Sequence, residues 1–412
     1  MVMPCGRCGE SGSQALYPKE ATLQTRTSEA VGQDEAGAAP FLTRAPALSL
    51  PKGGGAIKGI GEKFAANPVT GTGSMSVPIA TAPGRGGFAP ELALTYDSGA
   101  GNGPFGLGWS LSLPSISRKT EKGLPRYCDA EASDVFILSG AEDLVPTGEM
   151  AQGVAVYGEL YDIASFRPRV EGLFARIERW SKVDHPEAVF WRTISRDNVT
   201  SWYGRSADSR LADPAEPARI FQWLICQRHD DKGNVIDYRY VADDPDELER
   251  GQVWERNRTR QQHMAYRYPS EILYGNRYPF LPKLEASGMW PQVPPDEWFF
   301  RTIFDYGDPR APTAPERSED VLRGRPLQRL DAFSNYRAGF ELRCHRLCWR
   351  ILTYHRFEAL APAPMPVRAT EFGYRDVDEQ ALRAPRAGGY ATLDTVTQRA
   401  YEFADNAYRD RV

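Results

Sequence analysis

The chain has 412 residues, of which 11% are aromatic, and a net charge of −4 from 50 basic and 54 acidic side chains. Because the two signs are interspersed, the charge pattern argues against nucleic acid and membrane surfaces as partners. No apolar run approaches the roughly 20 residues of a membrane-spanning helix, and residues 1–40 lack the features of a secretory signal. We therefore expect a protein that is made in the cytoplasm. If it is exported, its export would not use a secretory signal peptide.

The N-terminal part of the chain carries few signs of order. Residues 1–47 are rich in small and polar side chains without a sustained period, which predicts a disordered leader. Within it, Cys5 and Cys8 have the half-site spacing of a zinc knuckle. The only plausible partners are Cys344 and Cys348, from a distant segment. Thiols that bind no metal are the favoured interpretation, but spacing alone does not decide whether Cys5 and Cys8 bind one.

From about Leu48 onwards, apolar and polar residues alternate as in half-buried strands. The alternation is visible in Ser74–Ala80, Glu91–Tyr96 and Gly106–Leu113, with Gly/Pro turns between them. In the last segment, the period would place Leu107 and Trp109 on one face with the later leucines.

Further strands follow towards the C-terminus. Two hairpins are predicted from strand pairs around turn residues, namely Val189–Thr193 with Val199–Tyr203, and Phe221–Cys226 with Val235–Tyr240. Single strands are predicted at Trp298–Tyr306, Phe340–Cys344, Leu347–His355 and Thr370–Tyr374. A helix is expected only within Pro245–Tyr266. These elements predict a mainly β fold of large curved antiparallel sheets with long connections and few short helices, in one domain over 48–412.

Two glycine-rich segments raise the question of nucleotide binding. Residues 101–106 read GNGPFG and formally match GxGxxG, but a dinucleotide site needs a helix directly after the glycines. A strand pattern follows instead, so we expect a glycine turn between strands. The run Gly53–Gly61 lacks the Gly-Lys-Ser/Thr ending of a phosphate-binding loop. We predict no bound cofactor.

Two acidic motifs are candidate sites. Glu247 and Glu249 form an ExE pair, as in mono-ADP-ribosyltransferases, but the Ser-Thr-Ser strand of those enzymes is missing and a solvated acidic loop is favoured. Residues Asp230–Asn234 lack the ligand spacing of an EF-hand, so a hairpin turn is expected there. With the following Val-x-x-Tyr-x-Tyr, this run also looks like one degenerate YD unit.

The histidines and cysteines are scattered along the chain. The histidines are at 185, 229, 263, 345 and 355, and the cysteines are at 5, 8, 128, 226, 344 and 348. No HExxH and no GxSxG occurs among them, and no Cys–His neighbour pair is plausible as a catalytic pair. The sequence therefore predicts a non-enzyme, without catalytic, cofactor-binding or metal-binding residues, and assigns His345 and His355 no role.

Several segments, some of them long, resemble one known family. The matching segments are Leu48–Ile57, Gly61–Ser74, Leu94–Trp109, Val135–Val145, Asn257–Thr259, Tyr274–Arg277, Tyr336–Arg343 and Arg346–Cys348. They are similar to the SpvB domain found at the N-terminus of toxin-complex B components, which is related to Rhs/YD-repeat shells. The similarity extends from about residue 48 to the end.

This resemblance implies a structural role in a secreted bacterial toxin. In such complexes, B and C proteins together form a hollow β-shell around the cytotoxic C-terminal part of the C protein, and an A component supplies the channel. The implied partners are therefore a C-type shell protein with its effector, and an A-type pore component. The sequence stops where the propeller of B would begin, so we expect a fragment or a chain that needs a partner.

The sequence is compatible with two other functions. The chain could be the non-catalytic N-terminal module of an SpvB-like ADP-ribosylating toxin whose catalytic domain is missing. It could also be a carbohydrate-binding β module, which exposed Trp and Tyr side chains would suggest, although no motif supports that idea.

Overall fold

The computed structural model describes residues 62–67, 71–140, 142–244, 246, 248, 253–284, 288–307, 328–360, 364–375, 389–404 and 407–411. All of them belong to a compact unit that spans Thr43–Val412. The predicted leader at 1–47, with Cys5 and Cys8, and the run Gly53–Gly61 lie outside the described residues. No helix in the described part is long and apolar enough to cross a membrane.

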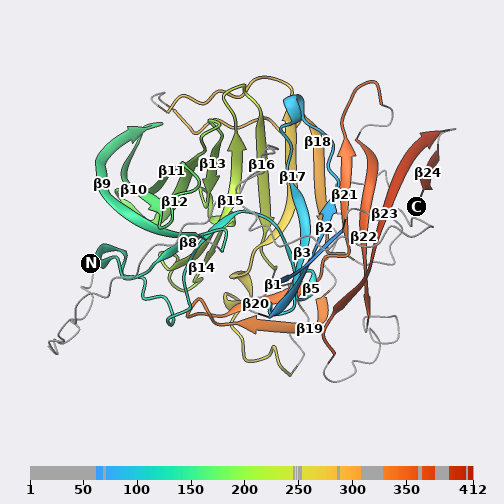
Figure 1. The fold of residues 1–412 in the computed structure, drawn as a ribbon, viewed down its shortest axis with the longest axis horizontal. Coiled ribbons are helices and arrows are strands. Elements are labelled where there is room, and N and C mark those ends of the chain that lie inside the picture. Colours follow the sequence, from blue (N-terminus) through green and yellow to red (C-terminus); the bar gives the residue numbers. More distant parts are fainter. Residues whose placement is uncertain are drawn as a thin grey trace, which may run out of the picture. The chain divides into compact units, whose positions relative to one another are not determined.

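One large antiparallel sheet dominates the fold (Figure 1). Its first strands in chain order are β7 (Ser115–Arg118), β8 (Phe136–Leu138), β9 (Glu142–Val156), β10 (Glu159–Pro168), β11 (Arg176–Lys182), β12 (His185–Ile194), β13 (Thr200–Tyr203), β14 (Arg210–Ala212) and β15 (Ile220–His229). It continues with β16 (Val235–Val241), β17 (Tyr268–Asn276), β18 (Trp298–Asp305), β21 (Arg350–His355), β22 (Met365–Arg375), β23 (Thr392–Ala404) and β24 (Ala407–Arg411). The predicted mainly β, antiparallel architecture is confirmed.

The strands from β7 to β15 close into a ring. Each strand from β7 to β13 pairs with the next one along the chain, and both ends of this series pair with β15. There Ile116 of β7 lies opposite Trp223, while Thr200 of β13 lies opposite His229. Because both ends meet on one strand, the ring has no free edge in its hydrogen-bonding ladder.

The interior of the ring is filled by large apolar side chains. Trp191 and Trp223 are completely buried, and their ring centroids lie 6.0 Å apart. Phe136 packs edge-on against both, at 5.0 and 5.7 Å. These residues belong to one apolar core to which every ring strand contributes, so strand alternation directs one face of each strand inwards.

The outer face of the same strands carries a second aromatic cluster. Phe190 and Trp202 alternate with the inward-facing Trp191 and Tyr203 and pack with Trp180 on the other side of the sheet. Trp290, from the connection between β17 and β18, contacts Trp202 with centroids 5.2 Å apart and covers this cluster. The ring wall is therefore packed on both faces.

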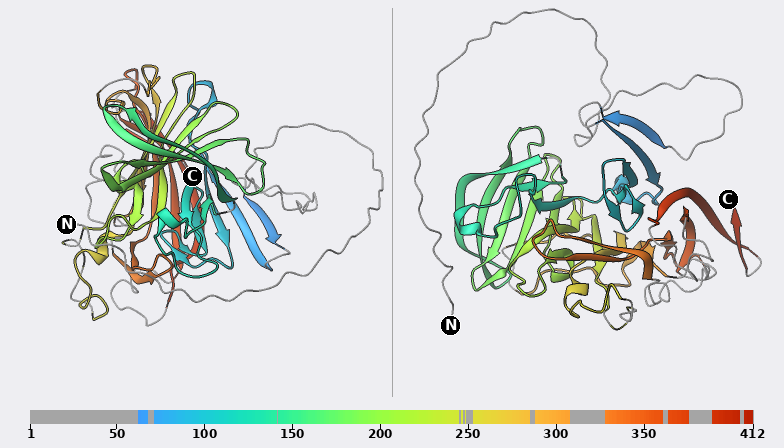
Figure 2. Two further views of the ribbon diagram at one scale, coloured as in Figure 1. Left: turned by 90° about the vertical axis from the view of Figure 1, so that its left-hand side faces the viewer. Right: turned by 90° about the horizontal axis from the view of Figure 1, so that it is seen from below.

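Beyond β15 the sheet continues as a row of strands without closing again. Figure 2 shows the ring strands in green at one end and β21–β24 in orange to red at the other. Both predicted hairpins are present, because β12 pairs with β13 and β15 pairs with β16. The other predicted C-terminal strands correspond to β18, β20, β21 and β22, with shifted ends.

Three smaller sheets accompany the large one. The first contains β1 (Lys63–Asn67), β2 (Thr72–Ile79), β3 (Leu92–Asp97) and β6 (Trp109–Leu111), the second β4 (Asn102–Gly103) and β5 (Gly106–Leu107), and the third β19 (Gln328–Asn335) and β20 (Leu342–Arg346). Strands β2 and β3 contribute to the same apolar core as the ring.

One strand prediction was wrong in its length. The segment Gly106–Leu113 is broken into β5 and β6, because Gly108 adopts a φ of +79° that strand geometry does not allow. A side chain at this position would also collide with Tyr96, whose ring lies 2.4 Å from the site of a Cβ atom. Consequently Leu107 is exposed instead of sharing a buried face with Trp109.

The only helices in the described part are single 3-10 turns. They are η1 (Arg85–Gly87), η2 (Asp129–Glu131), η3 (Ala207–Ser209) and η4 (Gln262–Met264). The helix expected within Pro245–Tyr266 is wrong for its described residues, where turns at 253–260 precede η4. An amphipathic helix needs an apolar stripe, whereas this segment buries Glu255 and His263 and pairs Arg258 with Glu341.

Candidate functional site

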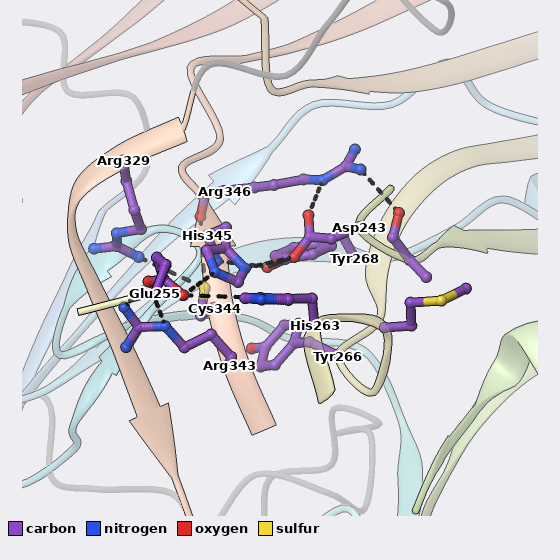
Figure 3. A network of polar contacts seen from close by, with 12 residues as sticks. Asp243, Glu255, His263, Tyr266, Tyr268, Arg329, Arg343, Cys344, His345 and Arg346 are labelled. Carbon is purple, nitrogen blue, oxygen red and sulfur yellow. Dashed lines mark hydrogen bonds and ion pairs between the residues drawn. The ribbon is translucent and has the colours of Figure 1, made fainter. Parts of the chain in front are cut away.

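A group of buried charged and polar side chains lies beside β20 (Figure 3). It contains Asp243, Glu255, His263, Arg343, His345 and Arg346, which we call the β20 polar cluster. Strand β20 supplies three of them, the loop after β16 supplies Asp243, and the turn segment that ends in η4 supplies the other two. All are at most 7% exposed. Buried charges are costly unless they are paired, so the arrangement of partners decides what this cluster can do.

Asp243 anchors one side of the cluster. Arg346 donates from Nε to Oδ1 at 2.6 Å, and the Tyr268 hydroxyl donates to Oδ2 at 3.0 Å. The same Oδ2 lies 3.1 Å from Nδ1 of His345. This carboxylate therefore fixes the orientation of the His345 ring and leaves its Nε2 directed towards the opposite side.

Glu255 forms that opposite side. Arg343 donates to Oε1 from Nε at 3.0 Å and also from Nη2. The other oxygen, Oε2, lies 3.5 Å from His345 Nε2 and 3.8 Å from His263 Nδ1. Nη1 of Arg258 is 3.6 Å away from the same atom. Thus one carboxylate oxygen accepts from two nitrogens of Arg343, and the other oxygen faces two imidazoles.

His263 is the least satisfied member of the cluster. Its side chain is completely buried, and neither ring nitrogen has a hydrogen-bond partner. Burial lowers the pKa of this imidazole, and the neighbouring His345 lowers it further. The ring is therefore neutral near pH 7. The lone pair on one of its nitrogens receives no hydrogen bond, and the N–H of the other donates none.

The structure brings together residues that the sequence could not connect. Glu255, His263 and His345 can each present one ligand atom so that all three atoms lie within 4.8 Å of one another. They are separated by up to 90 positions in the chain, so no spacing rule links them. The only local signal of the cluster in the sequence is Arg343, His345 and Arg346 in β20, because charged side chains are unusual in a buried strand.

The remaining histidines lie outside this cluster. His185 is exposed beside Glu187, and His355 packs against Phe300. Burial lowers the pKa of His229 to about 4, and its ring lies against Phe280. None of the three contacts a member of the β20 polar cluster in the interactions found among the described residues.

The GNGPFG run forms the hairpin β4–β5, as predicted from its glycines. Its backbone groups are used in contacts with other segments: Arg329 donates to the Gly103 carbonyl at 2.7 Å, and the Cys348 amide donates to the Pro104 carbonyl at 2.7 Å. Gly106, at φ +91°, lies so close to Ala391 that a Cβ atom would be 2.7 Å from its carbonyl oxygen. These glycines therefore serve close packing.

The acidic run at 230–234 closes the β15–β16 hairpin. Oδ1 of Asp230 accepts from the amides of Lys232 and Asn234 at 3.0 and 2.8 Å, and Oδ2 accepts from the Asn234 side chain at 2.7 Å. Both carboxylate oxygens are engaged within the turn, as expected for a hairpin. The other acidic motif, Glu247 and Glu249, lies outside the described residues.

Three cysteines, Cys226, Cys344 and Cys348, are protonated thiols at neutral pH. Burial raises the pKa of Cys344 and Cys348, and it also raises that of Cys226. None of these three forms a disulfide. Cys344 instead lies 3.7 Å from Nη1 of Arg329.

A cavity of about 460 Å³ lies on the outer face of the ring wall. Glu178, Trp180 and Arg192 line it together with apolar side chains of β9. Oε2 of Glu178 accepts from Arg192 Nε at 2.7 Å and from the Trp180 indole at 2.9 Å. Glu178 and Arg192 therefore neutralise each other within the wall.

Comparisons with known proteins agree with the resemblance in the sequence. The family model described as Salmonella virulence plasmid 65kDa B protein, SpvB, matches residues 67–357. Mono(ADP-ribosyl)transferase SpvB of Salmonella choleraesuis (strain SC-B67) is 36% identical over 324 residues, covering 75% of this chain and 51% of that protein. The chain thus spans about half the length of the curated relatives that it matches.

Two solved structures are similar over most of the chain. TcdB2-TccC3 has a TM-score of 0.71 and 31% sequence identity, covering 89% of this chain and 17% of that one. The N-terminal domain of effector protein SpvB from Salmonella typhimurium strain LT2 has a TM-score of 0.65 and 32% identity, covering 79% of this chain and all of that one. By sequence model, sequence identity and fold, the chain belongs to the SpvB family.

Proposed function

We propose that the chain is a non-catalytic structural component of a secreted toxin complex, and that it forms part of the wall of a hollow β-shell around a cytotoxic effector. The observation that carries this proposal is the match to TcdB2-TccC3 over 89% of the chain. The partners would be a C-type shell protein with its effector and an A-type pore component. Export would proceed without a recognisable signal peptide, and no contact with nucleic acid or membrane is expected.

The physical properties of the sheet support a role as a wall. The ring has no free edge, and both of its faces are covered by aromatic side chains. A densely packed sheet of this kind can form part of a wall without any reactive group. The buried β20 polar cluster is closed to a substrate, because Glu255 and His263 are at most 1% exposed.

The second candidate function is the non-catalytic N-terminal module of an ADP-ribosylating toxin. It is favoured by the SpvB relatives, which are named mono(ADP-ribosyl)transferases and of which the chain covers about half. The coding sequence beyond Val412 would separate the candidates. Propeller repeats support the shell, and a Ser-Thr-Ser strand followed by an ExE pair supports the enzyme.

A carbohydrate-binding role loses most of its support from tryptophans. It depended on exposed Trp and Tyr side chains; among the described residues only Trp254 is an exposed tryptophan, and the exposed tyrosines are Tyr278, Tyr336 and Tyr390. Trp180, Trp191 and Trp202 are instead buried in the two aromatic clusters of the ring wall.

Binding to a C-type partner tests the shell proposal. The full chain would be co-expressed with a C-type shell protein and analysed by affinity capture and size-exclusion chromatography. We expect the two chains to elute together and the solubility of this chain to increase. Equal, monomeric solubility of the chain with and without the C-type protein would contradict the proposal.

Measurement of NAD cleavage tests the non-enzymatic part. We expect the purified chain to release no nicotinamide from NAD above the rate of buffer. Cleavage by the chain that is abolished in the Glu249→Ala variant would show that it is an enzyme.

A further inference from the structure

We propose that Glu255, His263 and His345 bind one divalent transition-metal ion, with zinc as the preferred metal, in a buried site that leaves the fourth coordination position to water. The proposal is independent of the shell function and goes beyond the sequence, which predicted no metal-binding residue. Two imidazoles and one carboxylate are an established set of zinc ligands. The three ligand atoms come from two segments, the turns that end in η4 and strand β20.

The geometry requires only small adjustments. With bonds of about 2.1 Å, tetrahedral coordination separates the ligand atoms by about 3.4 Å. Oε2 of Glu255 is already 3.5 Å from His345 Nε2 and 3.8 Å from His263 Nδ1. All three atoms lie within 4.8 Å, so modest side-chain rotations bring the two imidazoles into range.

His263 supplies an independent reason to place a ligand there. Both of its ring nitrogens are buried without a hydrogen-bond partner, and leaving such groups unsatisfied is unfavourable. The other members of the cluster make hydrogen bonds. The buried polar atoms of the cluster without a partner are therefore those of His263, where the ion would lie. A metal ion would bind the free lone pair of this neutral imidazole.

The surrounding residues already have the arrangement that a metal site needs. Asp243 accepts at Oδ2 from His345 Nδ1, 3.1 Å away, so the lone pair of that ring is on Nε2, which faces Oε2 of Glu255 at 3.5 Å. Carboxylate–histidine–metal arrangements of this kind fix the tautomer and orientation of the ligand. On the other side, Arg343 holds Oε1 of Glu255, so that Oε2 faces the imidazoles.

The nearby arginines have their own anionic partners. Arg346 pairs with Oδ1 of Asp243, and Arg258 pairs with Glu341 at 2.9 Å. Arg258 is the one cation of the described residues that also approaches the proposed ligand oxygen, at 3.6 Å. A metal ion would therefore compete with one long arginine contact, and it would tie the turn segment to β20.

Metal titration of the full chain tests this site. Because Cys5 and Cys8 offer a separate possible zinc site, the background is the C5S/C8S double variant, stripped of metal with a chelator. We expect one Zn²⁺ or Co²⁺ to bind per chain and the Tm to rise by about 2 °C or more. Bound Co²⁺ should show visible absorption without a thiolate-to-cobalt charge-transfer band.

The His263→Gln variant, in the same background, should lose metal binding and the rise in Tm. His355→Gln is the matched control, since His355 is also a partly unpartnered, largely buried histidine outside the cluster, and it should bind as the parent does. Absence of stoichiometric Zn²⁺ and Co²⁺ binding to the parent would overturn the proposal. So would equal binding by the His263→Gln variant. Neither result depends on whether the chain binds a shell partner.

Discussion

The ring interior and the β20 polar cluster are equally sealed from water but are held together by different forces. In the ring, completely buried Trp191 and Trp223 pack through non-directional apolar contacts. In the cluster, Glu255 and Arg343 are also buried, and each depends on a specific charged partner at a fixed distance. A ring residue can therefore be replaced by another of similar shape, whereas a cluster residue cannot change without stranding its partner.

The largest expected effect lies in the ring. Trp223→Ala should lower the free energy of unfolding by about 3–5 kcal/mol, because it leaves a cavity among Phe136 and Trp191 and frees the Val189 carbonyl that the indole binds. Denaturant unfolding followed by fluorescence measures this change. Trp254→Ala, at a position that is 51% exposed, is the control and should change stability little. Equal losses in both variants would contradict the packing of the ring.

The next largest effect separates the two regions most clearly. Glu255→Leu should cost on the order of 3 kcal/mol, because it strands the buried guanidinium of Arg343. The double variant Glu255→Leu/Arg343→Met should be more stable than Glu255→Leu alone, since it removes both charges. A double-mutant cycle in denaturant measures the coupling. Additive losses would show that the pair does not act as a unit.

A smaller effect is expected from pH at His229, which is in ring strand β15 but outside the apolar interior and the β20 polar cluster. Burial lowers the pKa of His229 to about 4 from its ordinary value near 6.5. Between these values the unfolded chain binds more protons than the folded one, so stability should fall as the pH decreases from 6.5 to 4. His229→Gln should flatten the pH dependence of the denaturant midpoint in this window. An unchanged slope would show that His229 titrates normally in the folded chain.

The smallest effect is expected at the surface. Arg260 pairs with Asp246, and both side chains are more than half exposed. Arg260→Ala should leave the denaturant midpoint unchanged within error, because exposed ion pairs add little. A clear loss would mean that the turn segment next to the β20 polar cluster depends on this surface pair.

Strand alternation and turn residues predicted the hairpins β12–β13 and β15–β16 and the β fold, because these depend on local patterns. The long strand β9 was missed, since its residues between Glu149 and Gly153 are exposed and lack an apolar alternation. The β20 polar cluster could not be predicted either. Its members are far apart in the chain, and only the tertiary fold shows that Asp243 and His345 are neighbours.

The proposed function depends on whether this chain helps to enclose an effector, and protease protection measures that directly. The C-type partner with its effector would be digested in the presence and absence of this chain, and the effector fragment would be followed on gels over time. The account predicts that the effector persists many-fold longer when the chain is bound. Digestion at the same rate with and without the chain would contradict it.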